Sequence, residues 1–134
     1  MNLSECLNDL VEIAREYDYA RTNANRLEIK SVSETAQWLK GQAADRQRHR
    51  NWRDEFLGFL ESLDDMLLRD VLAVMLIGRD KDYSDFENRE KRLLTAQRNA
   101  DMFGLQGKRA MVRVLSKESR LHAHLTTGMK LINI

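Results

Sequence analysis

The 134-residue sequence has no proline and one cysteine, and its charges nearly cancel, with 22 basic against 21 acidic residues. Because proline interrupts helices, its absence leaves long helices possible anywhere in the chain. A single cysteine, Cys6, excludes an internal disulfide framework and a zinc site built on cysteines, and we expect it to be a half-buried structural thiol. The longest apolar run, Val71 to Ile77, is far shorter than a membrane span, and the amino terminus shows no basic-then-apolar signal. We therefore expect a cytoplasmic protein without a membrane span.

Helix-forming residues are abundant. Leucine (19) and alanine (11) outnumber valine (6), isoleucine (5) and threonine (5), a balance that favours helix over strand. With 43% hydrophobic residues and a net charge of +1, the composition is that of a globular protein and not of a disordered one. We predict one all-α domain over residues 1–134, an orthogonal or irregular bundle of five to seven helices around a buried central helix.

Capping residues and apolar spacing place the first helices. Ser4 is the expected N-cap of a first helix, and Ser31 with Glu34 forms a capping-box pattern ahead of a second. Residues 52–63 have strong amphipathic spacing. Whether this third stretch continues the second helix is left open by the sequence.

The central helix is expected over Met66 to Ile77, capped by Asp64 or Asp65 and terminated at Gly78. It is apolar on almost every side, which is typical of a helix surrounded by others.

The later helices are more highly charged. Ser84 and Glu87 predict the start of a helix that ends at Gly104. From Gly107 onward we expect one or two basic helices, broken near Ser116, and then an apolar tail over residues 131–134.

Two strings in the sequence resemble a known family. Ala14–Asp18, within LVEIAREYD, is similar to an AREFD-like string of a first helix, and FLESLDDMLLRDVLAVMLIGRDKD is similar to a helix with an LMWLGRGD-like end. The string HLTTGMKLI is similar to a YLLGTPLL ending. On these motifs the chain resembles a divergent member of a bacterial helical domain family of unknown function. The resemblance implies a compact helical domain of bacterial or phage origin and assigns no activity.

Charge is distributed unevenly along the chain. The net charge is −3 over residues 1–45, +4 over 46–53, −7 over 54–90 and +7 over 91–134. This asymmetry can steer a charged partner toward one part of the molecule.

The first basic cluster consists of Arg46, Arg48, His49, Arg50 and Arg53. Arginine forks bind phosphates, and the neighbouring Trp52 indole can stack on a base or hold an arginine, which would suit nucleic acid. The favoured interpretation is structural, because Trp52 shares a helical register with Phe56 and the arginines can neutralise the acidic segment that follows.

The second basic set comprises Arg109, Arg113, Lys117 and Arg120 at helical spacing. Such a stripe can lie on phosphates, on an acidic protein surface or on an anionic membrane, or it can fold against the chain's own acidic segment. The sequence leaves these alternatives open.

Other candidate chemistry is weak. Arg79, followed by Asp80 and Asp82, could bind a carboxylate or phosphate, but the simpler interpretation is positive charge at a helix C-terminus. His122 and His124 point about 200° apart on a helix, so they cannot share a metal ion. No phosphate-binding loop, nucleophile elbow, HExxH or EF-hand pattern occurs, and we expect no enzymatic activity, no metal and no cofactor.

The sequence therefore predicts a non-enzymatic binding or regulatory protein that acts through protein–protein contacts, including self-association. The alternative is a nucleic-acid-binding protein that uses basic helices at 46–53 and 108–120. The candidate partner-binding residues are Arg46, Arg48, Arg50, Arg53, Arg79, Arg109, Arg113, Lys117 and Arg120.

Overall fold

The computed structural model describes residues 1–24, 32–80, 89–104 and 107–134. Its helices are α1 (Leu3–Ala24), α2 (Val32–Ser62), α3 (Asp65–Arg79), α4 (Arg89–Gly104), α5 (Lys108–Lys117) and α6 (Leu121–Leu131). Over the described ranges there is no strand, so the prediction of an all-α bundle is confirmed. No helix within these ranges has both the length and the apolar character that crossing a membrane requires.

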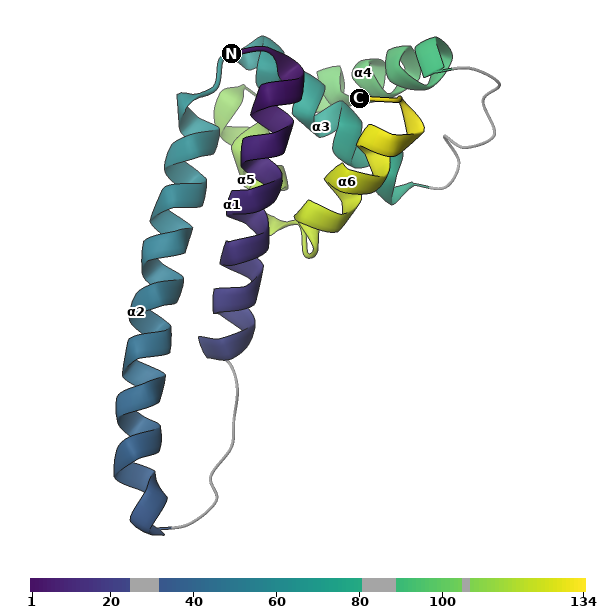
Figure 1. Ribbon diagram of the computed structural model, residues 1–134. Coiled ribbons are helices and arrows are strands. Elements are labelled where there is room, and N and C mark those ends of the chain that lie inside the picture. Colours follow the sequence, from purple (N-terminus) through teal and green to yellow (C-terminus); the bar gives the residue numbers. More distant parts are fainter. Residues whose placement is uncertain (25–31, 81–88, 105–106) are drawn as a thin grey trace.

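Among the described helices, α3 has the most neighbours, while α2 packs on α1 and α5. Figure 1 shows α1 and α2 as a long antiparallel pair, with α2 extending past the end of α1, and α3 running close to the other end of the pair. α6 and α4 pack on α3, and α5 and α1 complete its surroundings. The expected buried central helix is therefore α3.

α1 begins two residues earlier than the sequence predicted. The Asn2 side-chain oxygen accepts a hydrogen bond from the Glu5 backbone N–H at 2.8 Å, and the Glu5 carboxylate accepts one from the Asn2 N–H at 3.4 Å. This reciprocal pair is a capping box, in which asparagine caps a helix as well as serine does. The prediction that Ser4 is the N-cap is wrong, because the helix already includes Leu3.

α2 is one continuous helix of 31 residues, which answers the question left open by the sequence. The half-buried residues Gln42, Asp45, His49 and Trp52 and the buried Phe56 recur at steps of three and four along one face. The α1–α2 pair is held partly by Tyr17, whose ring lies 5.1 Å from that of Phe56 and 5.4 Å from that of His49. The capping box expected at residues 31 and 34 lies outside the described side chains.

α3 is buried along most of its length. Asp64 caps it, as predicted, through a carboxylate oxygen that accepts from the Leu67 N–H at 2.8 Å. Residues 71–77 are all buried, whereas Met66 at the start is 63% exposed. The prediction that α3 ends at Gly78 is wrong, because Gly78 is helical and α3 continues to Arg79.

Gly78 does not end α3 but allows α6 to pack closely against it. A Cβ atom placed on Gly78 would lie 1.7 Å from the carbonyl oxygen of His124 in α6, and one on Gly128 would lie 2.2 Å from the carbonyl oxygen of Val74 in α3. The backbones of α3 and α6 therefore approach more closely than any side chain at these two positions would allow.

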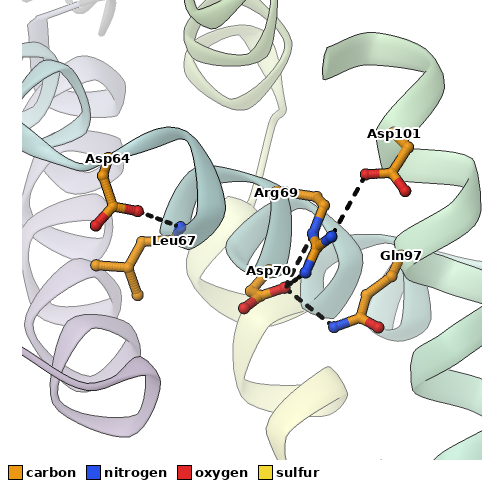
Figure 2. A network of polar contacts seen from close by, with 6 residues as sticks. All are labelled: Asp64, Leu67, Arg69, Asp70, Gln97 and Asp101. Carbon is orange, nitrogen blue, oxygen red and sulfur yellow. Dashed lines mark hydrogen bonds and ion pairs between the residues drawn. The ribbon is translucent and has the colours of Figure 1, made fainter. Parts of the chain in front are cut away.

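A polar network joins α3 to α4 (Figure 2). One carboxylate oxygen of Asp70 accepts hydrogen bonds from Arg69 at 3.2 Å and from the Gln97 amide at 3.1 Å, and Arg69 also lies 3.8 Å from the Asp101 carboxylate. These contacts satisfy the two charged residues in the middle of an otherwise apolar helix.

The C-terminal region divides as expected into two helices, α5 and α6, separated by residues 118–120. α4 ends at the predicted Gly104, and the capping residues expected at 84 and 87 lie outside the described residues. Ile132 is 2% exposed, so much of the apolar tail belongs to the core, and Ile134 is 43% exposed.

Candidate binding surfaces

The arginines of the first basic cluster lie on two different sides of α2. Arg46, Arg50 and Arg53, which we call the α2 stripe, are spaced by four and three residues and so share one side of the helix. Arg48 lies on the opposite side, where its guanidinium is 3.7 Å from the carboxylate of Asp45. All four arginines are exposed. The cluster that looked continuous in the sequence is therefore divided by helical geometry.

Trp52 belongs to the side of α2 that faces α1. It is half-buried and lines a hollow together with Glu12, Ile13, Glu16 and Glu55. The indole therefore lies away from the α2 stripe, and the interpretation of Trp52 as a stacking partner within the basic cluster is wrong. Its register with Phe56, which is 2% exposed, has the structural meaning expected from the sequence.

The second basic set is shorter than its sequence spacing predicted. Arg109, Arg113 and Lys117, which we call the α5 stripe, are exposed along one face of α5. Arg120 does not continue that face, because α5 ends at Lys117 and Arg120 adopts a left-handed backbone conformation with a φ of 58° ahead of α6.

α2 and α5 meet near the end of α2. Glu61 of α2 lines a hollow of about 350 Å³ together with Lys108, Arg109 and Val112 of α5. Glu61 lies on the same side of α2 as Arg50, eleven residues earlier, and the eight residues from Arg53 to Glu61 span about 12 Å of helix. The α2 stripe and the start of the α5 stripe thus lie on one side of α2, separated by about 12 Å of helix.

Over the described residues, no carboxylate of the acidic segment forms an ion pair with either stripe. Asp70 pairs with Arg69 at 3.2 Å, and Asp80 pairs with Arg79 at 3.0 Å. No ion pair joins the α2 stripe or the α5 stripe to a described carboxylate. The interpretation that these cations are balanced within the fold finds no support in this part of the chain.

Arg79 is engaged at the end of α3. Its guanidinium donates to the Asp80 carboxylate at 3.0 Å and to the Glu118 carboxylate at 3.2 Å, and Glu118 also lies 3.6 Å from His124 Nε2. The hydrogen bond to Asp80 is the main cause that raises the pKa of Arg79 above its ordinary value. Arg79 therefore ties the end of α3 to the turn between α5 and α6. Asp82 lies outside the described residues.

The outward face of α1 forms a ridge that the sequence did not single out. Asn8, Glu12, Arg15, Glu16 and Tyr19, which we call the α1 ridge, are all exposed. Tyr19 is 63% exposed, although tyrosine usually buries much of its ring. An aromatic residue on the polar side of the first helix is the sequence signal that could have found this ridge.

A hollow borders the α1 ridge on each side. The α1–α6 hollow, of about 570 Å³, is lined by residues that include Val11 of α1, Met129 and Lys130 of α6, and Ile134. The α1–α2 hollow, of about 500 Å³, contains Trp52 and Ile13. Both hollows combine apolar side chains with charged residues at their edges, a mixture typical of surfaces that bind other proteins.

The histidines and the cysteine were the remaining candidates for a metal site or a reactive thiol. Among the residues that the structure describes, no group of three or more side chains could hold a metal ion. Cys6 is fully buried, and not half-buried as expected. Burial, followed by the charges of Asp9 and Asp64, raises the pKa of the Cys6 thiol to about 11, so the thiol stays protonated near neutral pH.

No family model, curated protein or solved structure matches this chain, so its function is inferred from its own residues.

Proposed function

We propose that this chain is a non-enzymatic binding protein whose partner is another protein, held on the α1 ridge and in the two hollows beside it. The observation that carries the proposal is the exposed Tyr19, one helical turn beyond Arg15, which lines both hollows; one hollow contains Trp52 and the other Ile134. Tyrosine and tryptophan are enriched where proteins meet, because each combines a large apolar ring with a polar group. The proposal includes a cytoplasmic location and membership of the helical family that the motifs resemble, both of which rest on the sequence.

Site-specific crosslinking tests the proposed function. A photoreactive phenylalanine analogue at position 19 lies on the α1 ridge, and the same analogue at the exposed position 54 lies on α2 away from α1. We expect light to link position 19, but not position 54, to another protein in nuclease-treated cells. Crosslinks that are equally frequent at both positions, or absent at position 19, would contradict the proposal.

A second variant separates binding from folding. Tyr19→Arg replaces an exposed ring, so the thermal midpoint should change little. With the photoreactive analogue at position 12 of the same ridge, the chain that keeps Tyr19 should crosslink to a partner. The chain that also carries Tyr19→Arg should lose this crosslink.

A further inference from the structure

The α2 and α5 stripes together form a second surface, separate from the α1 ridge. We call it the basic surface, and its members are Arg46, Arg50, Arg53, Arg109, Arg113 and Lys117. All six are exposed, and none is ion-paired to another described residue. Six unpaired cations on one part of a small protein attract a partner with closely spaced negative charges.

The spacing of the cations is set by the helix. Arg46, Arg50 and Arg53 span about 10 Å of α2, and Glu61, beside Arg109, lies about 22 Å from Arg46 along the same axis. Duplex DNA carries one negative charge for about every 1.7 Å of its length, so a straight surface of this length meets several phosphates.

The basic surface lacks the apolar groups that a protein partner needs. The exposed large hydrophobic residues among the described ones are Met1, Tyr19, Met66, Leu94, Met102 and Ile134. None of them belongs to α2 or α5. Because protein interfaces are anchored by buried apolar or aromatic side chains, a surface on which exposed cations outnumber the neighbouring carboxylate of Glu61 suits phosphates better than it suits a protein.

Among the described side chains, the basic surface also lacks a ring on which a base could stack. Trp52 faces α1, and Phe56 is buried. Proteins that bind single strands use such rings as stacking platforms, whereas duplex backbones are bound by cations alone. We propose that the basic surface binds the phosphate backbone of double-stranded nucleic acid without reading its sequence. This inference is independent of the protein partner proposed for the α1 ridge.

The salt dependence of duplex binding is the first test. Fluorescence anisotropy of a labelled duplex of about 20 base pairs gives the affinity between about 50 and 200 mM salt. If all six cations meet phosphates, the logarithm of the association constant falls against the logarithm of salt with a slope of about −5, a loss of roughly a thousandfold over this range. Absence of binding at the lowest salt would overturn the inference.

Matched variants locate the surface. Arg50→Gln with Arg113→Gln should make the slope shallower by about two units and weaken binding roughly tenfold at the lowest salt. Arg98→Gln with Arg48→Gln removes the same charge from exposed positions on α4 and on the opposite side of α2, and should leave the slope unchanged. Equal effects of the two pairs would show that net charge alone causes the attraction and would overturn the inference.

Two further measurements test whether an acidic protein or a single strand binds the basic surface instead. Glu61→Gln removes the carboxylate beside Arg109, so duplex binding should tighten by about two- to fivefold. Polyglutamate or a single-stranded oligonucleotide of equal charge should compete more weakly than duplex. A competitor of either kind that equals duplex would overturn the choice of a duplex backbone.

Discussion

At the scale of single residues, Gly78 and Gly128 matter because they have no side chain. Replacing either with alanine would place a methyl group within 2.2 Å of a backbone oxygen of the facing helix. We expect each variant to lower the free energy of unfolding by about 3 kcal/mol, the upper end of the usual cost of overpacking a core. Chemical denaturation measures this loss.

Gly58 supplies the control for that prediction. It lies near the C-terminal end of α2, where an added Cβ atom would meet nothing within 4 Å. Gly58→Ala should therefore raise the free energy of unfolding by up to about 1 kcal/mol, because alanine favours the helix. Similar losses at Gly58 and Gly78 would contradict the close crossing of α3 and α6.

Two histidines predict a dependence of stability on pH. His49 Nε2 and His122 Nδ1 are buried without a hydrogen-bond partner among the described residues. Burial is the main cause that lowers the pKa of both side chains, and Arg53 and Arg21 lower the pKa of His49 further. The negative charge of Asp18 raises the pKa of His122, whereas the positive charges of Arg15 and Arg120 lower it.

The sign of the effect follows from proton binding. Near the ordinary histidine pKa of about 6.5, the unfolded chain takes up protons that the folded chain excludes. The two histidines therefore contribute to the stability of the fold above that pH, and this contribution to the free energy of unfolding is lost as the pH falls below it. His49→Gln with His122→Gln should reduce the loss of unfolding free energy between about pH 7 and pH 5. An unchanged loss in the double variant would show that neither histidine is shielded.

At the scale of the helices, α3 is expected to contribute most to the core. Leu72 and Leu76 are 0% and 4% exposed. Leu72→Ala or Leu76→Ala should each lower the free energy of unfolding by about 2–5 kcal/mol, the usual cost of deleting a buried leucine side chain. Met66→Ala, in the exposed first turn of the same helix, should change it by less than about 0.5 kcal/mol. Losses below that level at both leucines would contradict the assignment of the core.

Helix ends were the least predictable elements. The sequence left Asp64 and Asp65 as alternative caps of α3, and the structure shows that Asp64 is the N-cap. Ser4 failed because Asn2 offers an equally good acceptor, with Glu5 three residues later. Gly78 failed because a glycine near the end of an apolar run can either terminate a helix or admit a neighbouring backbone, and only the position of α6 distinguishes the two.

At the scale of the whole molecule, opposite charges on separate surfaces predict self-association. The hollows beside the α1 ridge carry Asp9, Glu12, Glu16 and Glu55, and the basic surface lies elsewhere. Contacts between such exposed charges weaken as salt screens them, so sedimentation should show a larger species at low salt than at high salt. The buried Ile132 cannot contribute to this contact. A monomer at both salt concentrations would remove the prediction.

The sequence by itself determined the all-α class, the buried centre of the molecule and the two basic stretches. These properties depend on composition and on residues close in the chain, whose helical spacing can be read directly. The inward position of Trp52 could also be predicted from the sequence, because Trp52 shares a helical register with Phe56.

Only the tertiary structure decided which residues share a surface. It placed Glu61 beside Arg109 and set the α1 ridge between two hollows. It also brought Gly78 against His124, 46 residues later in the chain. The physical reason is that helix-to-helix packing depends on the shapes of side chains distant in sequence, whereas periodicity describes one helix at a time.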